Sequence, residues 1–166
     1  MFRATCIILT VVSLGCASRK TLPDYTVIPF KQHAEKESMT YFIEGVFREK
    51  HVEASLTLRQ FRDSDRHADR FHWYGTDGGS PELVVSKVAL SLDGQDIKIP
   101  PHAYGRHGDF SFQGNPLRFL TKDKELIFRF GASDGAGAYF LDIIATEEGF
   151  LRSRTYTHNP SSGTWE

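Results

Sequence analysis

Apolar and polar residues alternate with a period of two along much of the chain. The clearest example is residues 52–59, whose apolar face consists of Val52, Ala54, Leu56 and Leu58 and whose polar face consists of Glu53, Ser55, Thr57 and Arg59. Such alternation predicts a strand with one buried and one solvated face. The sequence contains no amphipathic helical stripe, and only residues 31–38 have room for a helical turn.

Turn signals divide the rest of the domain into further short strands. Asp93-Gly94 is a dipeptide that favours a tight reversal. Pro100 and Pro101 end a strand because neither can donate to a ladder. Besides 52–59, we expect strands at 40–49, 82–92, 97–99, 109–113, 117–120, 125–130, 138–146 and 150–157. About eight to ten short strands with turns roughly every 8–12 residues predict an all-β domain, most simply an antiparallel β-sandwich, with a closed β-barrel as the alternative.

The first 16 residues have a different pattern. Arg3 gives a positive start, an apolar stretch of about 11 residues follows, and a small residue precedes Cys16, which are the three parts of a secretory signal. The uncharged run of residues 4–18 would form a helix of about 22 Å, whereas a bilayer core of about 30 Å needs roughly 20 residues. We therefore expect a signal peptide at 1–15 rather than a transmembrane helix.

Val12–Cys16 reads Val-Ser-Leu-Gly-Cys and resembles the lipobox of bacterial lipoprotein precursors, which signal peptidase II cleaves. Gly15 matches the position before the cleaved bond and Cys16 the lipid acceptor, whereas Ser13 departs from the more usual Leu. The resemblance implies a diacylglyceryl thioether and an N-acyl chain on Cys16. Two acyl chains of ordinary length would contribute on the order of 20 kcal/mol to the free energy of partitioning into a membrane. The alternative is an ordinary signal that is cut nearby and leaves a soluble protein.

Residues 16–24 would then form the lipidated cysteine and a short tether, and residues 25–166 a single β domain. The polar segment 17–23 spans at most about 25 Å when extended, which keeps the domain close to the membrane. By the same resemblance, Ala17 after the lipidated cysteine is not an inner-membrane retention residue. We expect the cell envelope as the location, and the outer membrane if the cell has one.

Composition narrows the possible partners and the sources of stability. The chain has 20 Lys and Arg against 21 Asp and Glu and no block of like charge, which argues against a nucleic-acid partner. The two cysteines are Cys6, within the signal, and Cys16, so the domain contains no disulfide and depends on core packing. About 140 residues bury enough surface to need no metal, and we expect no cofactor.

One sequence pattern suggests catalysis. Residues 131–135 satisfy the G-x-S-x-G pattern around Ser133, and Asp142 and His158 follow in the order that hydrolases of that type use. That chemistry requires Ser133 on a strand-to-helix elbow. The residues that follow, 138–144, have strand character instead. We therefore expect no catalytic residues, and a small envelope serine hydrolase is the less favoured alternative.

Metal-binding patterns are incomplete. Residues 63–69 alternate acidic or histidine side chains as a calcium loop does, but Ala68 occupies the glycine position and Tyr74 the position of the bidentate glutamate. Interleaved arginines would compete with a cation. Two histidine pairs have a five-residue spacing but no third ligand at a zinc-like spacing: His67 with His72, and His102 with His107. We expect no metal site.

The best binding candidate is the aromatic run at residues 71–75, Phe-His-Trp-Tyr-Gly, before a polar turn. Exposed aromatic faces stack on sugars or peptides, although alternate members of a strand would instead point into the core. A second polar loop lies at 102–109. The candidate binding residues are His72, Trp73, Tyr74, His102 and His107. We expect a tethered, non-catalytic domain that binds or scaffolds an envelope protein or a glycan, with a carbohydrate-binding module as the specific alternative.

Overall fold

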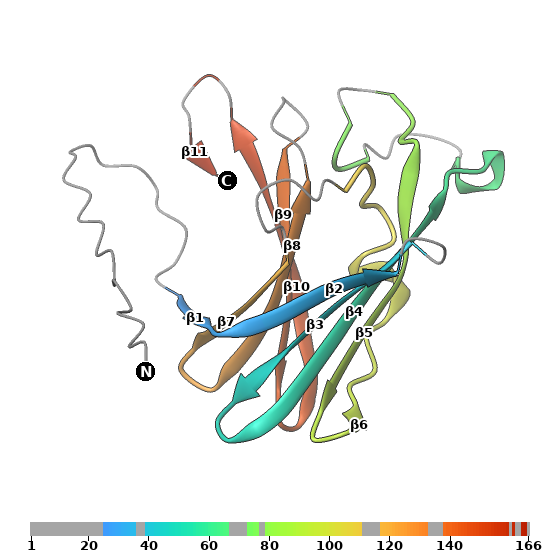
Figure 1. The fold of residues 1–166 in the computed structure, drawn as a ribbon. Coiled ribbons are helices and arrows are strands. Elements are labelled where there is room, and N and C mark those ends of the chain that lie inside the picture. Colours follow the sequence, from blue (N-terminus) through green and yellow to red (C-terminus); the bar gives the residue numbers. More distant parts are fainter. Residues whose placement is uncertain are drawn as a thin grey trace, which may run out of the picture.

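Two antiparallel β-sheets pack face to face (Figure 1). The structure is a computed structural model that describes residues 25–35, 39–66, 73–76, 79–110, 117–132, 138–159, 161 and 164–165. Its strands are β1 (Thr26–Ile28), β2 (Phe30–Glu35), β3 (Thr40–Phe47), β4 (Lys50–Gln60), β5 (Leu83–Leu92), β6 (Gln95–Asp96), β7 (Arg118–Lys122), β8 (Glu125–Ala132), β9 (Tyr139–Thr146), β10 (Gly149–Asn159) and β11 (Thr164–Trp165). Two 3₁₀ helices, η1 (Asp63–Asp65) and η2 (Pro101–Ala103), interrupt the connections.

One sheet has six strands in the order β1-β7-β8-β9-β10-β11, and the other has five in the order β2-β3-β4-β5-β6. The predicted β-sandwich is therefore confirmed. The alternative of a closed barrel is wrong, because each sheet keeps its own free edges. Within the described residues, no helix has the length and apolar character needed to cross a bilayer.

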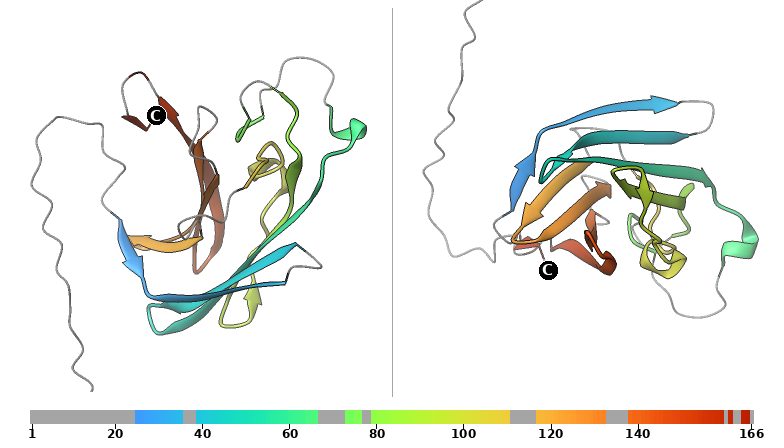
Figure 2. Two further views of the ribbon diagram at one scale, coloured as in Figure 1. Left: turned by 45° about the horizontal axis from the view of Figure 1, so that its top comes forward. Right: turned by 90° about the horizontal axis from the view of Figure 1, so that it is seen from below.

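The segment from β1 to β2 belongs to both sheets. β1 pairs with β7 in the six-stranded sheet, and β2 pairs with β3 in the five-stranded sheet. Pro29 lies between them and has no N–H to donate, so the ladder is interrupted there. Figure 2 shows this segment turning from one sheet into the other. One corner of the sandwich is therefore closed by continuous chain.

Tight turns set the register of the hairpins. Arg48 and Glu49 have positive φ angles of 51° and 67°, and Asp93 and Gly94 have 49° and 74°. Two successive residues in this region are typical of the type I′ turn, whose twist matches that of the flanking strands. The predicted reversal at Asp93-Gly94 is confirmed, and the turn at 48–49 places Glu44 opposite Glu53.

The core lies between the sheets. The predicted apolar face of β4 is confirmed, because Val52, Ala54, Leu56 and Leu58 are all buried. Phe119, Phe128 and Phe130 extend the core from the six-stranded sheet and are each 0% exposed. Burial of an aromatic or aliphatic side chain of this size contributes roughly 1.5–3 kcal/mol, so core packing stabilises this domain without disulfides.

Three expectations about the strands were wrong. Residues 31–35 form β2 rather than a helical turn, because their backbone pairs with β3 although their side chains are exposed. Residues 97–99 lie outside any strand, and the pairing with β5 is made by β6 instead. Asp109 and Phe110 are not in a strand either, and the rest of the expected strand at 109–113 lies outside the described residues.

Candidate functional site

The predicted lipid acceptor and the predicted binding residues occupy different environments. Cys16 and His72 lie outside the described residues. His102 is exposed in η2, and Trp73 is half-buried with its ring edge-on to Phe61 at 5.6 Å. Among the predicted residues that the structure describes, a ring contact joins Tyr74 and His107, which stack at 4.8 Å with an interplanar angle of 15°. The aromatic run thus contributes partly to internal packing.

His107 is an internal structural group. Its Nδ1 is 3.0 Å from the carbonyl oxygen of Tyr104, and its Nε2 is 3.0 Å from Oγ1 of Thr155. A carbonyl can only accept, so Nδ1 carries the proton and Nε2 accepts from the threonine hydroxyl. Burial lowers the pKa of His107 to about 4, and the charge of Arg106 acts in the same direction, against the hydrogen bond to Tyr104. The ring is therefore neutral and fully bonded within the fold.

Asp142, the acidic residue that follows the G-x-S-x-G pattern, forms a buried ion pair with Arg129 on the adjacent strand. Arg129 Nε donates to Oδ1 at 2.6 Å and Nη2 donates to Oδ2 at 2.8 Å. Asp142 is 0% exposed and Arg129 is 7% exposed. The rings of Tyr25, Phe140 and Tyr156 surround the guanidinium at 4.9, 5.5 and 5.4 Å. Both carboxylate oxygens are therefore committed to a structural contact.

His158, the histidine that follows the G-x-S-x-G pattern, is not brought to Asp142. Asp142 is paired in register with Arg154, and His158 lies four residues further along β10, which corresponds to about 13 Å of strand. The His158 ring instead contacts Trp165 at 5.2 Å between ring centroids. Ser133 lies outside the described residues. Asp142 and His158 therefore do not form the acid–histidine contact that a triad needs.

The outer face of the five-stranded sheet has a shallow groove. One row of side chains crosses it in register and consists of His33, Phe42, Ser55 and Ala89. His33 stacks on one face of Phe42 at 4.7 Å with an interplanar angle of 9°. Since Ser55 and Ala89 are small, space of about 240 Å³ remains beside Phe42. The Phe42 ring therefore borders a shallow groove whose base includes the small side chains of Ser55 and Ala89.

The next row on this face is rich in carboxylates. It consists of Lys31, Glu44, Glu53, Ser91 and Asp96, again in register. Glu44, Glu53, Ser91 and Asp96 all line the groove. Glu44 and Glu53 are directly opposed, an arrangement that destabilises a sheet when both carry charge. The groove therefore combines an aromatic ring, hydroxyl groups and hydrogen-bond acceptors.

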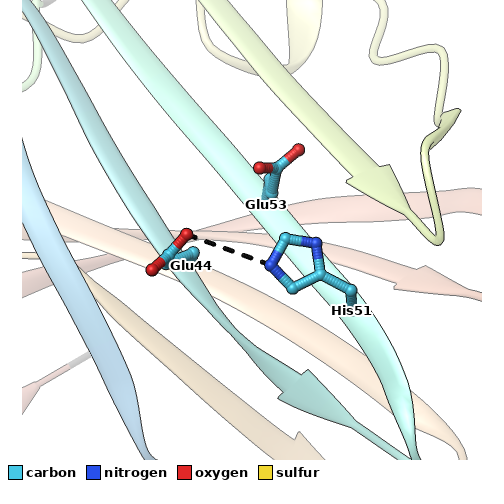
Figure 3. Close-up of side chains that lie close together, drawn as sticks. All are labelled: Glu44, His51 and Glu53. Carbon is cyan, nitrogen blue, oxygen red and sulfur yellow. Dashed lines mark ion pairs between the residues drawn. The ribbon is translucent and has the colours of Figure 1, made fainter.

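His51 adds an imidazole to this row. It lies two residues before Glu53 on β4 and so projects from the same face. Each of three side chains, those of Glu44, His51 and Glu53, offers one ligand atom, and these atoms lie within 4.8 Å of one another. Figure 3 shows the three side chains. The side chains of Glu44 and His51 are 45% and 52% exposed. Sequence spacing missed this cluster because two strands contribute, although the turn at 48–49 fixes residues 44 and 53 as partners.

A second concavity, of about 790 Å³, lies where the β5–β6 hairpin and the segment to Pro100 face the β9–β10 turn. Its apolar lining includes Ile97, Ile99 and Phe150, which pack against the core. Lys50 donates to Glu147 across its margin at 2.6 Å and links the two sheets. The concavity therefore lies at the border between the sheets, and its apolar residues continue the core.

Comparison of the chain with protein-family models, with curated proteins and with solved structures found no match.

Proposed function

We propose that this chain is a lipid-anchored protein of the bacterial cell envelope whose β-sandwich is a non-catalytic binding module. The lipobox resemblance at Val12–Cys16 supports the anchor. The described chain begins at Tyr25, nine residues after Cys16, so the tether would hold the domain within about 30 Å of the lipid. The internal bonding of Asp142 and of His107 supports a non-catalytic role, because neither group is free to accept a proton from a substrate.

The ligand-binding surface in this proposal is the groove on the outer face of the five-stranded sheet. The observation that carries it is the Phe42 ring standing beside the low floor of Ser55 and Ala89, with carboxylates along the same groove. An aromatic face packs against the apolar face of a sugar ring, and carboxylates accept hydrogen bonds from its hydroxyls. The acidic row disfavours anions. The ligand class is therefore a neutral carbohydrate.

This surface is a better candidate than the aromatic run of the sequence. One face of the Tyr74 ring is covered by His107, and Trp73 is half-buried against Phe61. Phe42, in contrast, has His33 stacked on one face and lines the open groove. The carbohydrate-binding alternative is thus kept, with its aromatic group moved from Trp73 and Tyr74 to Phe42.

Replacement of the lipid acceptor tests the anchor. We expect Cys16→Ala to abolish incorporation of labelled palmitate and to release the domain from the membrane fraction. Cys6→Ala is the matched control, because Cys6 lies within the segment that is removed. Unchanged membrane fractionation and labelling of Cys16→Ala would contradict the anchoring mechanism.

Binding of a panel of neutral tetrasaccharides of glucose, N-acetylglucosamine and mannose tests the groove. We expect at least one of them to bind in calorimetry and Phe42→Ala to weaken that binding at least tenfold, since the stacking of a sugar ring on the aromatic ring is lost. Val46→Ala is the control, because Val46 lies on the same strand, is 59% exposed and is not part of the groove. A panel without any binder, or equal binding by Phe42→Ala, would refute the carbohydrate assignment.

A further inference from the structure

We propose that Glu44, His51 and Glu53 form a binding site for a divalent transition-metal ion of the Zn²⁺ type on the outer face of the five-stranded sheet. The inference concerns the ion alone and stands whether or not the neighbouring groove binds a sugar. It starts from the three ligand atoms that lie within 4.8 Å of one another, one from each residue.

The donor set fits such an ion. One imidazole nitrogen and two carboxylate oxygens are donors that Zn²⁺ accepts at about 2.0–2.2 Å, which places the ligand atoms about 3.4 Å apart around a tetrahedral ion. The three groups must therefore close by little more than 1 Å. Glu44 and His51 are about half exposed, so they can change rotamer without repacking the core. The imidazole disfavours Ca²⁺ and Mg²⁺, which prefer oxygen ligands alone.

The backbone beneath the cluster is fixed. β3 and β4 form one hairpin with a two-residue turn, and their register places Glu44 directly opposite Glu53. His51 follows the same face of β4 with a separation of two residues from Glu53. Ligands that project from paired strands keep their spacing better than ligands on loops. Figure 3 shows His51 and Glu44 directed toward each other, with Glu53 alongside on the same face of the sheet.

The charge of the cluster provides an independent reason to expect a cation. Opposed Glu44 and Glu53 repel, and Asp96 continues the same row two strands away. Lys31 contacts Oε1 of Glu44 at 3.7 Å, but its side chain is 87% exposed, so its charge is screened by water. The other oxygen, Oε2, faces His51 Nε2 at 3.9 Å. A divalent ion between these two atoms and Glu53 would neutralise the repulsion at its source.

Three protein ligands leave coordination positions open. In zinc proteins this arrangement is typical of sites that keep water or bind a further ligand, whereas purely structural sites are closed by four protein ligands. The open positions would face solvent beside the groove, since Glu44 and Glu53 belong to both. A bound ion could therefore accept an oxygen of a groove ligand as an additional contact.

Direct titration tests the site. The full-length protein, purified in detergent and treated with chelator, is titrated with ZnCl₂ in a calorimeter and, separately, with CoCl₂ in a spectrophotometer. We expect one high-affinity Zn²⁺ per chain and a Co²⁺ d–d absorption band that Zn²⁺ abolishes and an excess of Ca²⁺ or Mg²⁺ leaves in place. His51→Gln and Glu53→Gln should each weaken Zn²⁺ binding at least tenfold and remove the band.

Matched controls separate this site from others. His33→Gln changes another exposed histidine of the same sheet face and should leave Zn²⁺ affinity unchanged. Phe42→Ala should also leave it unchanged, so loss of sugar binding and loss of metal binding are distinguishable. Circular dichroism of each variant verifies that the fold is retained. Absence of a stoichiometric Zn²⁺ site, or one that His51→Gln and Glu53→Gln both retain, overturns the proposal.

Discussion

The outer faces of the two sheets each carry a cross-strand group of charges, and the two groups are organised in opposite ways. On the six-stranded sheet, Arg129 and Asp142 neutralise each other beneath aromatic rings and are almost completely buried. On the five-stranded sheet, Glu44 and Glu53 oppose each other in the open, beside a half-exposed His51. The first arrangement leaves no capacity for a ligand, whereas the second has unbalanced charge and accessible donors. Accessibility and imbalance together therefore distinguish a candidate site from a structural contact.

The aromatic cover explains why a charge can be buried on an outer face. Tyr25 packs beside Leu120, Ile127 and Ile144, which form a second small apolar cluster outside the main core. Burial of Tyr25, with its hydrogen bond to Tyr156 and the nearby charge of Asp142, raises the pKa of its hydroxyl. The six-stranded sheet is thus apolar on both faces at this point, and the ion pair is enclosed by it.

Removal of one partner from the buried pair should have a severe effect. We expect Arg129→Met to lower the free energy of unfolding by about 3–5 kcal/mol, because Asp142 is left buried without its counter-charge. Urea denaturation of the wild type and the variant measures the difference. The double variant Arg129→Met/Asp142→Leu should recover most of the loss, since it removes the stranded carboxylate. A single variant within 1 kcal/mol of the wild type would show that the pair is hydrated, like the cluster on the other sheet.

The buried ring of His107 should make the free energy of unfolding depend on pH. Its pKa is about 4 in the fold against a usual 6.5, so between these values the unfolded chain takes up a proton that the folded chain does not. Its contribution is therefore complete above pH 6.5 and is lost as the pH falls toward 4, by about 3 kcal/mol in total. Unfolding free energies measured between pH 7 and pH 4 should fall more steeply for the wild type than for His107→Gln. Parallel curves would mean that the ring is accessible to protons.

The open cluster should respond with the opposite sign and on a smaller scale. We expect Glu53→Gln, in chelator and at low salt, to raise the free energy of unfolding by about 0.2–1 kcal/mol, because it removes the like charge opposite Glu44. Added salt should reduce the gain by screening the repulsion. Glu148→Gln, in the exposed β9–β10 turn, is the control and should have no comparable effect. A net loss of stability in Glu53→Gln would place this cluster with the structural contacts.

The main strands followed from local sequence, whereas the pairing of charges did not. Alternation at 52–59 predicted β4 and its buried residues because one face of the strand lies on the core. β2 lacks this signal because its side chains are exposed, and only backbone pairing with β3 makes it a strand. Burial of Arg129 could not be predicted, since it depends on a register with β9 that residue type alone does not specify.

The candidate site residues were likewise predicted only where local sequence was sufficient. Tyr74 was chosen as part of an aromatic run and His107 as part of a polar loop, but an isolated bridge joins the two residues and both rings contact Tyr139 of the core. The Glu44–His51–Glu53 cluster escaped a search by spacing along one strand. It could have been found from the turn at 48–49, because a two-residue turn determines which residues of the hairpin face each other.

If the proposed lipid on Cys16 anchors the chain, the corner at Pro29 has a mechanical consequence. Any pull along the tether reaches β1 first, which has three residue pairs with β7. The same continuous chain then leads into β2, with six residue pairs to β3. Tension on the anchor would therefore act first on the pairing of β1 with β7 and then on the pairing of β2 with β3. Detachment of β1 alone would lengthen the segment between the lipid and the domain, while the five-stranded sheet and its exposed cluster stay folded.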